Sequence, residues 1–305
     1  MAKPLIVVTG ATGRTGGEVL RQLAARTDVA VRAAVHSPDK LKNAGSNVQV
    51  VAMDYGNTDS MVRALQGADK LYWVTPGGVG QIDYTRTMVD AAGAAGIRHI
   101  VKVGSLDPDV EPITGTDRQC GESERLIADS GIAHTFVRAS FYNQMFVAGV
   151  DGLRHGDTFM ALADGRTGWI DCRDIGAVAA QVLVEEGHAD KVYNLTGPEV
   201  LSFNDIQRIM ETEAGRPVAF VRLPEAALRQ MFAHETEECV EARLGCLRKL
   251  SGDYIAYVTD GVQALLGRPP IPFTQFCRDY ARQLFDTSMA PPFAAPRAAT
   301  PQQRA

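Results

Sequence analysis

The sequence has 305 residues, enough for one large domain or two smaller ones, and 45% hydrophobic and 22% charged residues are typical of a globular protein. A formal net charge of −5, with basic residues interleaved among acidic ones, argues against a nucleic-acid-binding surface. The five scattered cysteines include no C-x-x-C pair, which argues against a zinc site or a disulfide framework. No leader pattern or membrane-length apolar run is found, so we expect a cytoplasmic protein with no membrane contact.

The first half of the chain alternates between short apolar runs and helical patterns. The apolar runs predict strands at about 5–8, 29–35, 48–52, 70–74, 100–103 and 134–137. The helical patterns fall between them, at about 15–25, 61–65, 81–95 and 121–129. Continuous apolar strands separated by helices predict a parallel sheet that is covered on both faces. We therefore expect an α/β fold, with a doubly wound Rossmann domain in residues 1–150.

This alternation stops after about residue 150. A helix at 175–185 and a strand at 192–195 predict a segment, about 175–196, that returns to the main sheet. Further helices are predicted after an N-cap at Ser202, at 225–232 and at 275–285. We therefore expect a smaller C-terminal α+β substrate domain over 151–289. Residues 290–305 are rich in Pro, Ala and Gln, and they predict a disordered tail.

The strongest motif lies directly after the first predicted strand. Gly10, Gly13 and Gly16 follow the spacing GxxGxxG and open a predicted helix, which is the context of a dinucleotide-binding loop. The first glycine permits a tight turn, the second lets the backbone approach a pyrophosphate, and the third allows the helix to pack closely on the strand. The phosphate is then expected at the helix N-terminus. The predicted cofactor contacts of this loop are Gly10, Thr12, Gly13, Arg14, Thr15 and Gly16.

The end of the second predicted strand indicates which dinucleotide is bound. NAD-binding proteins usually place an Asp or Glu there to bind the ribose 2′-hydroxyl. Here the strand ends on His36 and Ser37, and Asp39 comes only after a proline. With Arg14 and Lys40 nearby, these side chains can hold a 2′-phosphate, so we predict that NADP(H) is preferred over NAD(H). Lys40 by itself is also compatible with the solvent-exposed start of a helix.

With these and further motifs, the chain resembles the NmrA-like branch of the atypical short-chain dehydrogenase/reductases over about residues 4–285. The matching segments are Val8–Gly13, Asp54–Tyr55, Gly96–Lys102, Glu124–Arg138, Trp169–Ile175 and Tyr193–Pro198. The resemblance implies an extended Rossmann domain, a smaller C-terminal domain and a cleft between them. It also implies a place for each part of the cofactor. Asp54 and Tyr55 are expected near the adenine, Val74, Thr75 and Pro76 beside the inner ribose, and Lys102 to Ser105 near the nicotinamide.

The chain departs from the wider superfamily in one respect. Most short-chain dehydrogenases use a Tyr-x-x-x-Lys pair for proton transfer, and none of the eight tyrosines here has a lysine four residues later. Three interpretations stay open: another group supplies the proton, hydride transfer needs no protein acid, or the protein performs no reaction. The resemblance is compatible with all three, because it includes quinone and dye reductases, other small-molecule reductases and NADP-sensing regulators.

Three residues are candidates for catalysis. Ser105 follows the fifth strand, where its hydroxyl can donate to a substrate carbonyl or simply belong to a turn. Tyr142 and Asn143 follow the sixth strand, where the tyrosine can act as an acid or orient a substrate. Equally, the aromatic side chains around Tyr142 can merely shape the pocket. Arg138 is expected to pair with an acidic residue. The acidic run at 234–239 lacks the HExxH spacing and is interpreted as an acidic helix face, so no metal is predicted.

Two functions follow from these observations. The first is an NADPH-dependent reductase of a small substrate, aromatic or quinone-like, acting as a monomer or homodimer. The alternative is an NADP(H)-sensing regulatory protein without turnover, which the missing Tyr-x-x-x-Lys pair keeps open.

Overall fold

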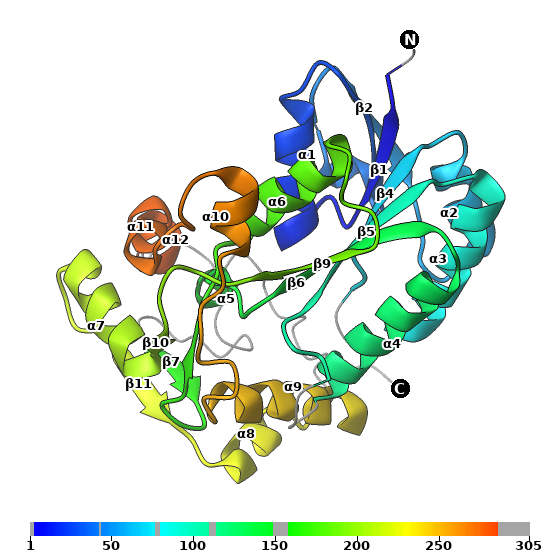
Figure 1. The fold of residues 1–305 in the computed structure, drawn as a ribbon. Helices are drawn as coiled ribbons and strands as arrows, with labels where there is room; N and C mark the ends of the chain where they lie inside the picture. Colours follow the sequence, from blue (N-terminus) through cyan, green and yellow to red (C-terminus); the bar gives the residue numbers. More distant parts are fainter. Residues whose placement is uncertain (1–2, 43, 77–79, 110–113, 149–157, 286–305) are drawn as a thin grey trace, which may run out of the picture.

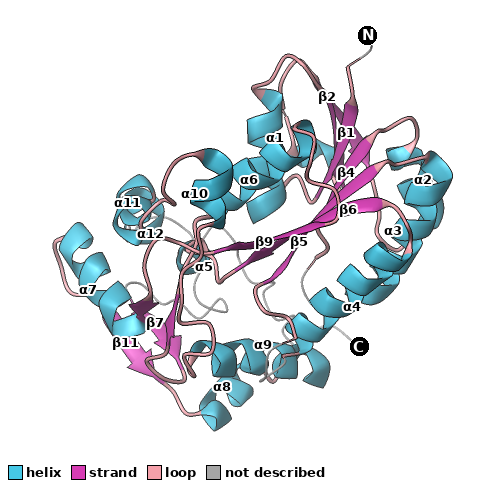
Figure 2. Cartoon of the chain, viewed as in Figure 1, coloured by secondary structure: helices cyan, strands magenta, loops and turns pink. Residues whose placement is uncertain are grey.

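The computed structural model describes residues 3–42, 44–76, 80–109, 114–148 and 158–285. Its centre is a parallel seven-stranded sheet in the order β3-β2-β1-β4-β5-β6-β9 (Figures 1 and 2). The strands are β1 (Leu5–Thr9), β2 (Ala30–Val35), β3 (Val48–Ala52), β4 (Lys70–Trp73), β5 (His99–Ser105), β6 (Ala133–Ala139) and β9 (Lys191–Leu195). All six strands expected in the first half are present, and the predicted parallel α/β fold is confirmed.

Helices cover both faces of this sheet (Figure 1). One face packs against α1 (Arg14–Ala24) and α6 (Cys172–Val184), with Val8, Val19 and Val178 in the shared core. The other face packs against α2 (Thr58–Leu65), α3 (Gln81–Ala95) and α4 (Gly115–Asp129). The apolar side chains of each strand point to alternate faces, so a parallel strand needs cover on both sides. The result is the three-layer arrangement of a doubly wound domain.

The strand order reverses at β1. From β1 the chain adds β2 and then β3 on one side, and it then crosses to add β4 on the other side. In open α/β sheets, ligands bind at such a switch point, outside the carboxyl ends of the strands. The segments that follow β1 and β4 are therefore where a ligand is expected.

The rest of the chain combines a returning segment with a smaller unit. Helix α6 packs on α1, and β9 pairs with β6, as predicted for the segment near 175–196. The smaller unit contains two short strand pairs and has a separate buried core around Phe203, Leu228 and Phe276. Its strands are β7 (Thr158–Ala161), β8 (Arg166–Thr167), β10 (Leu201–Ser202) and β11 (Ala219–Arg222). Its helices are α7 (Phe203–Ala214), α8 (Glu225–Met231), α9 (Glu237–Leu250), α10 (Gly261–Leu266), α11 (Phe273–Asp279) and α12 (Ala281–Phe285), and a short helix, α5 (Met145–Ala148), follows β6.

Several elements differ from the sequence expectation. Helix α4 begins at Gly115 rather than near residue 121, because Thr114 and Asp117 form a capping box that starts it earlier. The single helix predicted at 275–285 is two helices, α11 and α12, separated at Tyr280. The predicted tail at 290–305 lies outside the described residues. In the part of the chain that the structure describes, no helix has both the length and the apolar character needed to cross a membrane.

Candidate functional site: a cofactor cleft

The glycine loop has the backbone that its sequence predicts. Gly10 has φ of +57°, and a Cβ there would lie 2.6 Å from Cγ1 of Val74. The amide of Gly13 donates to the carbonyl of Gly10 at 2.7 Å, which closes the turn. A Cβ on Gly16 would lie 2.4 Å from that same carbonyl oxygen. The turn and the close packing of α1 therefore both depend on the absence of side chains at these positions.

The N-terminus of α1 is left open for an anion. Gly13 is the N-cap and offers no side-chain acceptor, and the first turn of α1 holds no acidic residue. The first backbone N–H groups of a helix have no partner within the helix, and the helix dipole adds partial positive charge there. Arg14 and Thr15 stand in this turn, the former exposed and the latter buried. The arrangement suits a phosphate group.

A pocket of about 260 Å³ opens at this helix end. Thr12, Gly13 and Arg14 line it from the glycine loop, and Gln144, Cys172 and Tyr280 line it from segments far along the chain. Gln144 holds this second wall in place: its Nε2 donates to Oδ1 of Asp171 at 2.8 Å, and its Oε1 accepts the amide of Cys172 at 2.9 Å. The pocket therefore lies between the Rossmann sheet and the later part of the chain.

The sequence did not single out Gln144, Cys172 or Tyr280 as pocket residues. They come from the loop after β6, the start of α6 and the break between α11 and α12, so no local pattern connects them. The one available signal was the position of Gln144, immediately after the candidate Asn143. Burial raises the pKa of the Cys172 thiol well above its ordinary value, so this side chain is an inert part of the wall.

Polar contacts connect the ends of β1 and β4 at the switch point. The Thr9 hydroxyl accepts the amide of Val74 at 3.0 Å, and the Tyr55 hydroxyl donates to the carbonyl of Val74 at 2.8 Å. Burial raises the pKa of Tyr55 to about 12. Asp54 is exposed beside it, and Thr75 and Pro76 continue from Val74 at the surface. The residues predicted for the adenine and inner ribose are thus gathered at one edge of the sheet.

The residues predicted to select NADP(H) lie in the glycine loop and after the end of β2, the strand next to β1. His36 is exposed directly after β2, and its Nδ1 lies 3.3 Å from the Ser37 hydroxyl. Lys40 is exposed at the end of a short 3-10 helix, Pro38–Lys40. Neither Arg14 nor Lys40 forms an ion pair with any residue that the structure describes. Two basic groups are therefore free for an added phosphate.

Lys102 lies within β5 and not in the glycine loop. Its side chain is buried, and its Nζ donates to the carbonyl of Val103 at 3.1 Å. It lies near Glu124, since a Cβ on Gly104 would be 2.5 Å from Oε1 of Glu124 and 3.5 Å from Nζ of Lys102. The expected pairing of Arg138 is confirmed by its ion pair with Glu124 at 2.6 Å. Contact between Lys102 and a nicotinamide stays a prediction.

The three candidates for catalysis differ in their surroundings. Ser105 donates its hydroxyl hydrogen to Oδ1 of Asp117 at 2.5 Å. Tyr142 is partly buried, and burial raises its pKa well above the ordinary value. Asn143 is fully buried, and neither atom of its side-chain amide has a partner among the described residues. A buried amide without partners is costly, so Asn143 is a place where a ligand or a water would be stabilised.

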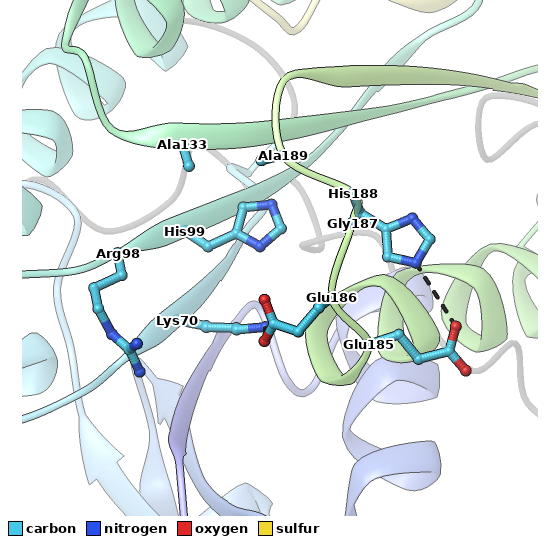
Figure 3. A pocket seen from close by; sticks show the side chains of 9 residues that line it. All are labelled: Lys70, Arg98, His99, Ala133, Glu185, Glu186, Gly187, His188 and Ala189. Carbon is cyan, nitrogen blue, oxygen red and sulfur yellow. Dashed lines mark hydrogen bonds and ion pairs between the residues drawn. The ribbon is translucent and has the colours of Figure 1, made fainter.

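A second pocket, of about 120 Å³, lies at the other end of the strands (Figure 3). Lys70 and His99 line it at the starts of β4 and β5, together with Glu186 and His188 from the segment before β9. Burial lowers the pKa of His99 to about 4, and Lys70 pairs with Glu186 at 3.4 Å. This pocket lies at the opposite end of the strands from the glycine loop. Several of its charged groups pair with one another, as Lys70 does with Glu186. We assign it no part in the cofactor cleft.

Comparison with known proteins decides the family. The family description "NmrA-like family" matches residues 2–258. The chain belongs to the NmrA-like family. It is 32% identical to an NAD(P)H azoreductase of Xenophilus azovorans over 91% of this chain and 98% of the relative. It is 33% identical to (4-alkanoyl-5-oxo-2,5-dihydrofuran-3-yl)methyl phosphate reductase of Streptomyces griseus, over 91% and 98%.

Solved structures show the same fold for this NmrA-like protein. The structure of an NADPH-dependent quinone oxidoreductase from Escherichia coli, complexed with NADPH, matches with a TM-score of 0.79 and 26% identity. That match covers 90% of this chain and 99% of the other. The family resemblance predicted from the motifs is therefore confirmed over nearly the whole chain.

Proposed function

We propose that the chain is an NADPH-dependent reductase of a small quinone-like or dye-like substrate. The observation that carries this proposal is the open N-terminus of α1, where the glycine loop, free backbone N–H groups and Arg14 meet at a pocket. The relatives add support, because their names are those of an NAD(P)H azoreductase, a furanone phosphate reductase and a quinone oxidoreductase. The proposal gives the protein a small-molecule partner.

We further propose that NADP(H) is preferred over NAD(H). Arg14 and Lys40 are exposed and unpaired among the described residues, and His36 and Ser37 add hydrogen-bonding groups where NAD-binding proteins usually carry a carboxylate. A charge-assisted hydrogen bond to a phosphate is about twice as strong as a neutral one. The extra phosphate of NADP(H) would therefore be bound more strongly than a ribose hydroxyl.

The reaction draws on the cofactor for its chemistry: NADPH, when bound, supplies a hydride. The chain binds the cofactor and the substrate and orients them. Tyr142 is a neutral phenol at neutral pH, and burial raises its pKa further, so its hydroxyl is suited to donate a hydrogen bond to a substrate oxygen or nitrogen. The unpartnered amide of Asn143 offers both a donor and an acceptor. Both side chains follow β6, at the carboxyl edge of the sheet.

NADPH oxidation with a panel of quinones, azo dyes and enones tests this proposal. Turnover with at least one class is expected, and it should be lost in Gly13→Asp, which places a carboxylate at the anion site. Gly93→Asp is the matched control, because Gly93 is an exposed helical glycine with open space around it. Tight NADPH binding with no turnover across the panel would favour the alternative, a cofactor-sensing protein. Equal loss in both variants would contradict the role of the loop.

A further inference from the structure

Ser105 is the exposed member of a polar network that is otherwise buried. It is partly exposed at the end of β5, while Asp117, at the start of α4, is 2% exposed. One carboxylate oxygen of Asp117 accepts the Ser105 hydroxyl at 2.5 Å. The other accepts the amide of Thr114 at 3.1 Å and the Thr114 hydroxyl at 2.9 Å. The first of these bonds, together with the Asp117 amide donating to the Thr114 hydroxyl oxygen at 3.0 Å, forms the capping box of α4. The two oxygens of Asp117 therefore have separate partners.

Lys249 completes this network from the smaller unit. It lies near the end of α9, is 2% exposed, and places its Nζ 2.9 Å from Oδ2 of Asp117. The same ammonium donates to the carbonyl of Asp107 at 3.3 Å. Since a buried charge is costly without a partner, each of the two charged groups depends on the other. As the partner of an ammonium, the Asp117 carboxylate can only accept hydrogen bonds.

The network also holds the backbone that follows β5. Asp107 has φ of +48°, an uncommon conformation for a residue other than glycine. Lys249 binds its carbonyl, and the hydroxyl of Tyr257 donates to its carboxylate. Both of these partners come from the later part of the chain. The backbone next to Ser105, at the carboxyl end of β5, is thus held by residues more than 130 positions away.

A serine hydroxyl has one hydrogen to donate and two lone pairs to accept with. The hydrogen of Ser105 is directed to Asp117, so the lone pairs are what remains for a ligand. We propose that Asp117 and Lys249 make Ser105 a fixed hydrogen-bond acceptor in the cleft, so that it recognises an N–H or O–H group rather than a carbonyl oxygen. Asp117 and Lys249 are positioning residues in this scheme. The inference rests on the proposed binding of NADP(H), and it reverses the donor role first expected of Ser105.

The substitution Asp117→Asn should convert Ser105 from an acceptor to a donor. The amide of Thr114 needs an acceptor, so the oxygen of the new side chain should stay on that side, with Lys249. The new NH₂ group would then face Ser105 and donate to it, which frees the serine hydrogen for the cleft. The double substitution Asp117→Asn/Lys249→Met tests the same change without leaving a buried ammonium unpaired.

The first experimental arm asks whether the donor is on the cofactor. Dissociation constants are measured for NADPH and for its 3-acetylpyridine analogue, which keeps the carbonyl but lacks the carboxamide N–H. If the donor is this N–H, the unmodified protein should bind NADPH about 3- to 10-fold more tightly, the range of one ordinary hydrogen bond. The preference should disappear in Ser105→Ala, and it should disappear or reverse in Asp117→Asn and in the double variant.

The second arm asks whether the donor is on the substrate or product. A hydroquinone and its dimethyl ether are compared as inhibitors of quinone reduction, and the same loss of preference is expected in the same variants if the substrate carries the donor. Asp205→Asn is the matched control, because Asp205 forms an equivalent capping box with Ser202 in α7. It should leave both preferences unchanged. Circular dichroism and melting curves establish that each variant is folded.

A preference that is lost in either arm supports the proposal and identifies the ligand. If both preferences survive in Ser105→Ala and Asp117→Asn, Ser105 is not a fixed acceptor and the inference is overturned. If only the Asp117 variants keep the preference, Asp117 and Lys249 do not orient the serine, and the positioning role is overturned. Failure of the unmodified protein to bind NADPH would instead overturn the proposed function together with this inference.

Discussion

Replacing Gly16 by alanine is expected to destabilise the protein and to weaken cofactor binding. A Cβ at this position would lie 2.4 Å from the carbonyl oxygen of Gly10 and 2.6 Å from that of Thr9. Ordinary contact begins near 3.4 Å, so α1 and the glycine turn must separate by roughly 1 Å. Both neighbours are backbone atoms in a tight turn, and neither can move aside as a flexible side chain would.

The cost can be bounded from these contacts. Overpacking of this kind costs about 1 to 3 kcal/mol, and the better helix propensity of alanine returns up to about 1 kcal/mol. We take the upper part of the range because backbone must move, and we expect a net loss of about 2 kcal/mol. Gly17→Ala is the control, since its Cβ would lie 3.4 Å from the carbonyl oxygen of Ala11. That variant should be unchanged or slightly more stable.

Urea unfolding followed by circular dichroism measures the stability difference, and isothermal titration with NADPH measures the binding. Displacement of the turn moves the N–H groups at the start of α1, so the dissociation constant for NADPH should rise at least about 10-fold in Gly16→Ala. If Gly16→Ala proves as stable as Gly17→Ala and binds NADPH equally well, the close approach of α1 to the turn is not what holds the site together.

Three further predictions concern charge. Removing Arg14 and Lys40 together, as alanines, should weaken NADPH binding about 10-fold and NADH binding by a smaller factor, as measured by titration with each cofactor. Arg138→Met should destabilise the protein by about 3 to 5 kcal/mol in urea unfolding, because it leaves the buried carboxylate of Glu124 unpaired, and adding Glu124→Gln should recover much of this loss. The pKa of His99 is lowered from 6.5 to about 4, so the folded state resists protonation more than the unfolded state does. Stability should therefore fall by about 1 to 3 kcal/mol as the pH drops from 6.5 to 4, and His99→Gln should flatten that part of the profile.

Local sequence patterns were sufficient to predict the sheet and the glycine loop. The strand, glycine turn and helix at the start of the chain are adjacent in sequence, so their spacing alone predicted Gly10 in a turn and Gly16 under a helix. The cap at Ser202 was predicted for the same reason, since Asp205 stands three residues later and forms the capping box. The return of β9 to the sheet followed from a single apolar run after a helix.

Contacts between distant segments could not be predicted in this way. Asp117 and Lys249 are 132 residues apart, and nothing in either local sequence indicates the other. The acidic run at 234–239 was interpreted as a helix face, but the extent of α9 was not predicted, although Val240, Leu244 and Leu247 have helical spacing. The bond from the Ser105 hydroxyl to Asp117 also depends on the tertiary fold, and the donor role expected of Ser105 toward a ligand stays a prediction.

The central claim is that the open end of α1 binds the phosphates of NADP(H). Isothermal titration of the unmodified protein with NADPH and with NADH tests it most directly, with Gly13→Asp measured alongside. We predict tight binding of NADPH, binding of NADH weaker by about 10-fold or more, and loss of both in the variant. No binding by the unmodified protein, or undiminished binding by Gly13→Asp, would contradict the account.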